Sequence, residues 1–227
     1  MRMILPFFLL FSLQGIGCNE APPATSIAVE SAAPLAAIAP QAAATDDPRR
    51  GDSLIAAMGL LRGQVVADMF AGDGYYTWKL LSAGARVLAI DDNPEAIAKL
   101  QAWKTSQGIG DDRLLIRQTE PGVPGLLEGE ADLALITREF STLVDRGTWI
   151  KQLMAGIKMP HTFYLVNYMP QQTPDGPPMS QRMDFDSVSD ELLSYGVDDI
   201  GILYKTMPGR YILFGSKPPV TLDDSGQ

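Results

Sequence analysis

The chain has 227 residues, 46% of them hydrophobic, and a formal net charge of −9. Such a negative chain repels polyanions and offers no basic stripe, which argues against a nucleic-acid partner. It has a single histidine, His161, and a single cysteine, Cys18, which argues against a metal centre of His and Cys ligands and against a Ser-His-Asp triad.

The first eighteen residues resemble a bacterial lipoprotein signal peptide. Arg2 supplies a positive charge, residues 4–13 are apolar but too few to span a bilayer, and Gly15-Ile-Gly-Cys18 is a small-residue cleavage site. The resemblance implies lipidation at Cys18 and a membrane-anchored protein of the cell envelope, on the periplasmic side or exposed at the surface. Ordinary secretion with an incidental cysteine is the alternative.

Residues 19–47 are rich in Ala, Pro and Ser and show no hydrophobic periodicity. Such a segment has too few apolar side chains to offset its ordering entropy, so we predict a disordered linker. Residues 48–218 suffice for one domain with a sizeable core, and residues 219–227 are expected to form a disordered tail.

Strand and helix patterns alternate along residues 51–169, which predicts a parallel sheet with crossover helices. The predicted strands cover residues 65–67, 86–90, 114–119, 131–137 and 163–169, and the predicted helices cover residues 51–60, 94–104 and 145–157, with a further helix starting at Tyr75. The link at residues 120–130 is rich in Pro and Gly, so any helix there has one or two turns at most.

The C-terminal part of the chain has a different pattern. A proline-rich loop at residues 170–183 follows the fifth strand, and we expect it to lie over the strand ends. A helix opening at Asp186 or Ser187 comes next. Strands at residues 200–207 and 210–216 are separated only by Pro208-Gly209, which predicts an antiparallel hairpin rather than another crossover.

The run from Val65 to Thr77 joins the first strand to a helix through a turn that contains Gly72 and Gly74. Glycines let a backbone approach a ligand closely, and a helix start offers free N–H groups. The next strand leads to Asp91, a carboxylate placed to accept hydrogen bonds from two ribose hydroxyls. We interpret the glycine turn and Asp91 together as a binding site for a cofactor that contains a nucleotide.

Both features have a structural alternative. The glycines can serve a tight turn alone, and Asp91 can be only an N-cap for the helix near Pro94, with Asp92 and Asn93 as competing caps.

Two residues distinguish a dinucleotide-binding site from a site for a cationic ligand. A dinucleotide site has a third glycine where this chain has Thr77. Asp68, at the end of the first strand, has no fixed use in a dinucleotide-binding turn but suits a cationic ligand. NAD is therefore disfavoured.

The residues of this turn resemble the first motif of class I S-adenosylmethionine (SAM)-dependent methyltransferases, which runs acid-x-G-x-G-x-G or, in many bacterial members, D-x-x-A-G-x-G-Y. The matching residues are Asp68, Ala71, Gly72, Gly74 and Tyr75, and Phe70 replaces the first glycine. The resemblance runs from about residue 49 to residue 218 and is closest to exported bacterial methyltransferases with a Gly-Tyr-Tyr turn. It implies an α/β, Rossmann-like fold with a seven-stranded, mostly parallel sheet and a C-terminal antiparallel hairpin.

The resemblance also implies which residues bind SAM. Asp68 and the backbone from Ala71 through Gly72 to Gly74 would hold the methionine part, Asp91 the ribose, and Thr119 or Glu120 the adenine edge, with Thr137 completing the set at the end of the fourth strand.

The methyl acceptor would face the ends of the fourth and fifth strands. The candidate residues there are Tyr76, Arg138, Glu139, Asn167 and Tyr168. A solvated Arg138–Glu139 pair and simple packing of Tyr76 are the alternatives.

The function implied is methyl transfer from SAM to a small-molecule or envelope acceptor. No Asp/Asn-Pro-Pro-Tyr motif follows the fourth strand, so methylation of nucleic-acid bases is not supported. Because SAM is made in the cytoplasm, the alternative for an exported protein is an inactive methyltransferase fold that binds ligands or acts as a scaffold. No metal is expected.

Overall fold

The computed structural model describes residue 47 and residues 49–218. The predicted signal peptide with Cys18, nearly all of the predicted linker and the predicted tail lie outside the described residues. Within the described part of the chain, no helix is both long and apolar enough to cross a bilayer.

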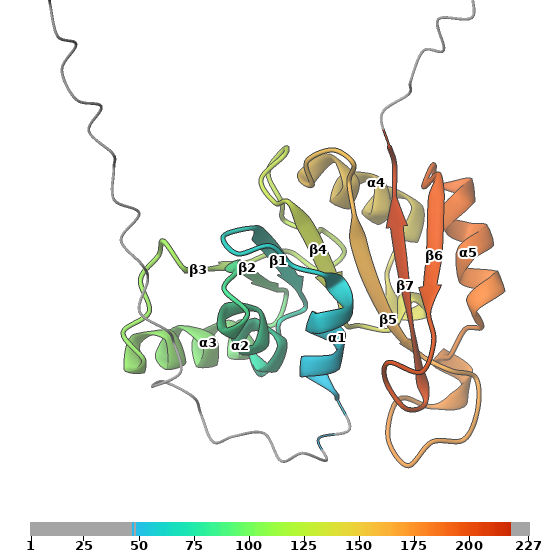
Figure 1. Cartoon of the computed structure of the whole chain (residues 1–227), viewed down its shortest axis with the longest axis horizontal. Helices are drawn as coiled ribbons and strands as arrows, with labels where there is room; N and C mark the ends of the chain where they lie inside the picture. The colour runs from blue at the N-terminus through green and yellow to red at the C-terminus, as the bar shows by residue number, and fades with distance from the viewer. Residues whose placement is uncertain (1–46, 48, 219–227) are drawn as a thin grey trace, which may run out of the picture. The chain divides into compact units, whose positions relative to one another are not determined.

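A seven-stranded sheet forms the centre of the domain (Figure 1). Its strands are β1 (Val65–Met69), β2 (Arg86–Asp91), β3 (Leu114–Gln118), β4 (Leu133–Ile136), β5 (Phe163–Tyr168), β6 (Asp199–Leu203) and β7 (Arg210–Ser216), in the order β3-β2-β1-β4-β5-β7-β6. β1 to β5 are parallel, whereas β7 runs antiparallel to β5 and β6. The predicted fold class is confirmed.

Helices cover both faces of this sheet (Figure 1). They are α1 (Gly51–Met58), α2 (Tyr75–Ser82), α3 (Pro94–Ser106), α4 (Arg146–Gly156) and α5 (Phe185–Ser194), with short 3-10 helices η2 (Phe140–Thr142) and η3 (Met179–Gln181). Leu54, Leu80 and Leu100 bring α1, α2 and α3 against one face, and Trp149 and Leu192 bring α4 and α5 against the other. Every residue of β4 is buried, which is why this strand is apolar without alternation.

Two boundaries differ from the prediction. α5 begins at Phe185, because Asp184 caps it by accepting a hydrogen bond from the Ser187 N–H at 2.8 Å, so the predicted start at Asp186 or Ser187 is wrong. β6 ends at Leu203, so residues 204–209 form the hairpin connection rather than Pro208-Gly209 alone. The described link between β3 and β4 contains no helix, as its Pro and Gly content suggested.

Substitution of Trp149 tests how much the hydrophobic core contributes to stability. Its ring is 1% exposed and stacks on Phe70 at 5.7 Å between centroids. We expect Trp149→Ala to lower the free energy of unfolding by about 3–5 kcal/mol, because it removes a large buried side chain and leaves a cavity. Urea denaturation measures the change. Trp103→Ala, at a partly buried position on α3, is the control, and an equal loss in both variants would contradict this assignment.

Candidate functional site

All candidate site residues of the domain lie at the carboxyl ends of the parallel strands or directly after them. β1 lies between β2 and β4, and the chain leaves it toward β2 before returning on the other side at β4. Ligands of open α/β sheets bind at such a point of reversed strand order. Asp68, Asp91, Asn167 and Tyr168 are the last or the last but one residues of their strands, while the other candidates follow in the adjoining loops or in the first turn of α2.

The glycine turn after β1 has the left-handed backbone its sequence requires. Gly72 and Gly74 have φ angles of 56° and 79°, so both are needed for the turn whatever else they do. A Cβ on Gly74 would lie 2.7 Å from the Leu100 side chain, so this glycine also lets α3 pack closely. The Ala71 N–H donates to the Ile90 carbonyl at 3.0 Å and fastens the turn to β2.

Asp91 is 3% exposed and accepts two backbone hydrogen bonds. Its Oδ2 accepts from the Gly72 N–H and its Oδ1 from the Asn93 N–H, each at 2.8 Å. The cap of α3 is Asn93, whose side chain accepts from the Glu95 N–H at 2.9 Å, so the helix-cap interpretation of Asp91 is wrong. Asp91 instead ties the glycine turn to the end of β2.

Asp68 is fully buried beside the turn. Its Oδ2 accepts a hydrogen bond from the Thr77 hydroxyl at 2.6 Å, while its Oδ1 has no partner among the described residues. Burial raises the pKa of the Asp68 carboxyl to about 7; the Thr77 bond opposes this rise and the charge of Asp91 adds to it. Thr77, which the sequence marked only as a missing glycine, therefore positions Asp68.

Phe70 is the departure from the methyltransferase motif, and it has a φ of 59°. Its ring stacks on Trp149, and the Arg138 guanidinium lies 3.7 Å from its centroid. Arg138 forms a bidentate pair with Asp92, with both N–O distances at 3.0 Å, and this pairing holds the pKa of Asp92 below its usual range. The interaction joins the ends of β4 and β2 to the turn after β1.

Glu139 is not part of a solvated pair with Arg138. It is 9% exposed, and its Oε1 accepts a hydrogen bond from the Tyr168 N–H at 3.0 Å. Burial raises the pKa of Glu139 to about 7, opposed by this bond and by the charges of Arg182 and Arg210.

The side chains of Asn167 and Tyr76 both form hydrogen bonds within the domain. Asn167 accepts from the Phe140 N–H at 3.0 Å and donates to the Tyr211 hydroxyl at 3.1 Å, so both ends of its amide are used. The half-buried Tyr76 donates to the Arg49 carbonyl at 3.2 Å. Asn167 therefore positions the loop after β4.

The predicted adenine and fourth-strand residues follow the strands β3 and β4. The Thr119 N–H donates to the Asp91 carbonyl at 3.0 Å, and the Thr119 hydroxyl donates to Val123. Glu120 is exposed and Thr137 is half-buried directly after β4. Of the three, Thr119 is fixed to the backbone of Asp91, and the cofactor role of all three stays a prediction.

Sequence reasoning missed Arg182 and Arg210, which organise residues 170–183 at the ends of β5 and β7. Arg182 donates to the carbonyls of Met169, Gln171, Asp175 and Pro177. Arg210 pairs with Asp175 at 3.2 Å, and both contact the Tyr168 hydroxyl. A basic residue paired across the fold has no local sequence signal. Whether the loop acts as a cover stays a prediction.

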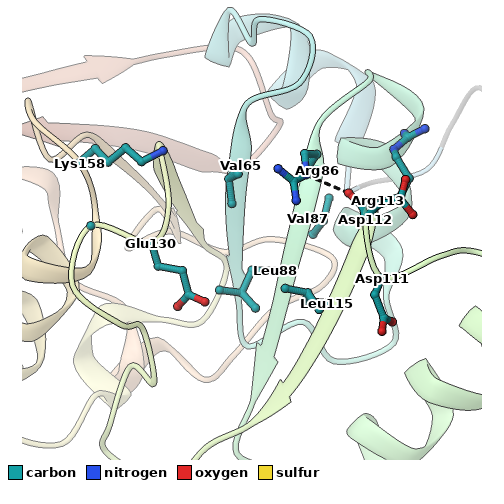
Figure 2. Close-up of a pocket in the computed structure, with 11 residues that line it drawn as sticks. Val65, Arg86, Val87, Leu88, Asp111, Asp112, Arg113, Leu115, Glu130 and Lys158 are labelled. Carbon is teal, nitrogen blue, oxygen red and sulfur yellow. Dashed lines mark hydrogen bonds between the residues drawn. The ribbon is translucent and has the colours of Figure 1, made fainter. Parts of the chain in front are cut away.

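A cavity of about 360 Å³ lies at the other end of the strands. Figure 2 shows Val65, Arg86 and Leu88 in its wall, and Arg86 donates to the Asp112 carbonyl. This cavity contains none of the candidate site residues.

Sequence-based comparisons do not identify the chain: no protein-family model matches it, and no curated protein does. Solved structures do match. A SAM-dependent methyltransferase from Aquifex aeolicus is 18% identical, with 75% of this chain and 94% of that chain covered and a TM-score of 0.67.

Two further structures match at similar levels. A 1,6-didemethyltoxoflavin-N1-methyltransferase from Burkholderia thailandensis, with S-adenosylhomocysteine bound, is 20% identical over 77% of this chain and 80% of its own, with a TM-score of 0.55. A possible exported protein from Bordetella parapertussis is 16% identical over 75% of this chain and 67% of its own, with a TM-score of 0.58. At these identities the comparison establishes the fold alone, and this chain has the fold of class I SAM-dependent methyltransferases.

The raised pKa of Asp68 predicts how stability depends on pH. Because its folded pKa of about 7 exceeds the usual value of 3.8 for an aspartate, the carboxyl destabilises the fold progressively as pH rises from about 4 to 7. We expect Asp68→Asn to be more stable than the parent above pH 7, by up to about 4 kcal/mol, and similar to it near pH 4. Urea denaturation across this range measures the difference. A constant difference at all pH values would contradict the raised pKa.

Proposed function

We propose that this protein transfers a methyl group from SAM to a small-molecule or envelope acceptor. The observation that carries the proposal is the pair of buried carboxylates, Asp68 and Asp91, on either side of a glycine turn at the reversal of strand order. Buried carboxylates beside a turn of this kind suit a ligand that has both a cationic part and hydroxyl groups.

The residues present fit SAM. Asp68 Oδ1, which has no hydrogen-bond partner among the described residues, suits the ammonium of the methionine part. Each Asp91 oxygen accepts one backbone hydrogen bond and keeps a lone pair for a ribose hydroxyl. Thr119, Glu120 and Thr137 line the same edge and are proposed to contact the adenosyl part.

When bound, SAM supplies a sulfonium-activated methyl group, so the protein has to align an acceptor and exclude water. The residues proposed to face the acceptor are Tyr76, Arg138, Glu139, Asn167 and Tyr168. The net charge of −9 favours a small or envelope molecule over nucleic acid.

We also propose that the protein is a lipoprotein of the cell envelope, anchored through Cys18. The signal-like N-terminal sequence supports this location, and the structural match to a possible exported protein agrees with it.

Phe70 favours the second candidate, a methyltransferase fold that binds ligands without turnover. A phenylalanine, whose ring contacts Arg138, stands where the motif has a glycine. SAM binding without methyl transfer to any acceptor would support this alternative.

Asp91→Ala tests cofactor binding. We expect the affinity for S-adenosylhomocysteine to fall at least about tenfold, because charge-assisted hydrogen bonds are worth about 1.5–3 kcal/mol each. Stability should fall as well, because the Gly72 and Asn93 N–H groups lose their acceptor. Calorimetric titration below the unfolding transition measures the affinity.

Asn93→Ala is the matched control for this experiment. It removes the cap of α3 and should cost about 0.5–2 kcal/mol of stability while leaving the affinity of the folded protein unchanged. If Asp91→Ala kept the parental affinity, the ribose assignment would fail.

Cys18→Ala tests the anchor. We expect the parent to partition into detergent and the variant to stay in the aqueous phase with the same urea denaturation profile, because a lipid at Cys18 would be joined to the domain only through the linker. Detergent-phase recovery of the variant would refute lipidation at this residue.

A further inference from the structure

Two buried groups of opposite charge at the ends of β4 and β7 have unused hydrogen-bonding capacity. Glu139 is 9% exposed and Arg210 is 7% exposed. Glu139 Oε2 and Arg210 Nε have no hydrogen-bond partner among residues 49–218. A buried carboxylate oxygen and a buried guanidinium N–H are both costly to leave unpaired, so each indicates a ligand atom of complementary chemistry.

Both groups contact Tyr168. Glu139 Oε1 accepts a hydrogen bond from the Tyr168 N–H at 3.0 Å. Arg210 is the cross-strand partner of Tyr168, and its guanidinium lies 4.3 Å from the centroid of the Tyr168 ring. The ion-pair partner of Arg210 is Asp175 rather than Glu139. The carboxylate and the guanidinium therefore flank one residue without satisfying each other.

The two groups also lie at the same edge of the sheet as the proposed cofactor residues, because β4, which precedes Glu139, pairs with both β1 and β5. The charge of Arg210 opposes the rise that burial causes in the pKa of both Glu139 and Tyr76. Asp68 acts on Tyr76 as well, in the opposite direction. The charges of Arg210 and Asp68 thus both act on Tyr76, which lies in the first turn of α2 directly after the glycine turn.

We propose that Glu139 and Arg210 form the acceptor subsite and bind a small molecule of amino-acid type, its amino group on Glu139 Oε2 and its carboxylate on Arg210 Nε. Such a head group offers N–H donors to the carboxylate and an anionic oxygen to the guanidinium at the same time. The proposed binding of this molecule depends only on Glu139 and Arg210, whereas its methylation rests on the proposed function.

In the reaction that follows, Glu139 removes one proton from the acceptor ammonium and becomes a neutral carboxylic acid. The freed nitrogen lone pair forms a bond to the methyl carbon of SAM. The sulfur–methyl bond breaks and its electron pair stays on sulfur, leaving S-adenosylhomocysteine and a methylated ammonium. A group that alternates between carboxylate and acid near neutral pH suits this transfer.

Nuclear magnetic resonance tests the subsite without knowledge of the natural acceptor. The Tyr168 amide reports on Glu139, and the Nε–Hε resonance reports on Arg210. The probes are glycine, acetate, which lacks the amino group, and N,N,N-trimethylglycine, which lacks N–H donors. Titration to about 100 mM detects a site with a dissociation constant of that size. We expect glycine to shift both resonances, acetate to shift Arg210 alone, and trimethylglycine to leave Tyr168 unchanged.

Glu139→Gln keeps an acceptor for the Tyr168 N–H, so the domain should stay folded, and its amide dispersion checks this. We expect its dissociation constant for glycine to rise about tenfold or more, because a charge-assisted bond is lost. Asp190→Asn, at an exposed carboxylate on α5, is the control and should leave glycine binding unchanged.

Each outcome of the titration decides between the proposals. Absence of any response to glycine means that the two groups are paired by ordered water, and it overturns the subsite. An equal response to glycine and trimethylglycine also overturns it. Repeating the titration with S-adenosylhomocysteine separates the two ideas: glycine binding without cofactor binding refutes the proposed function and keeps the subsite, and the reverse refutes the subsite alone.

Discussion

The buried carboxylate of Asp91 is the contact on which the ligand-binding edge of the domain depends. One oxygen holds the Gly72 N–H and the other holds the Asn93 N–H, while the carbonyl of the same residue accepts from Thr119. Three strand ends are thereby fixed relative to one another by one residue. Backbone groups at such ends have no partner in the sheet, so a side-chain acceptor is needed to satisfy them.

The same edge of the sheet also contains buried carboxylates whose hydrogen-bonding capacity is only partly used. Asp68 and Glu139 each have one carboxylate oxygen that no described residue satisfies, and burial raises the pKa of both to about 7. Such groups destabilise a fold unless a ligand pairs with them. Buried groups that lower the stability of the fold are common at binding sites, because the ligand that they bind compensates for the cost.

At Phe70 the side chain differs from the glycine of the motif, but the backbone keeps the left-handed conformation. The residue has the left-handed conformation expected of glycine, although a bulky side chain makes that conformation unfavourable. Its ring has contacts on Trp149 and Arg138 that help to offset the strain. Arg138 in turn is held by two hydrogen bonds to Asp92. The same ring gives the core and the ligand edge a direct connection.

The strands, the glycine turn and the terminal hairpin followed from the sequence alone, because hydrophobic runs and turn residues are local signals. So did the identity of Asp68 and Asp91 as site candidates. Boundaries were less accurate, as the start of α5 shows, because Asp184 and Asp186 are equivalent caps until the backbone geometry is known. Thr77, Arg182 and Arg210 acquired roles only in the folded chain. Thr77 and Arg182 contact residues on the far side of a turn or loop, and Arg210 contacts Tyr168 42 residues away. No local pattern marks such pairs, because they form only once the turn, the loop and the sheet have folded.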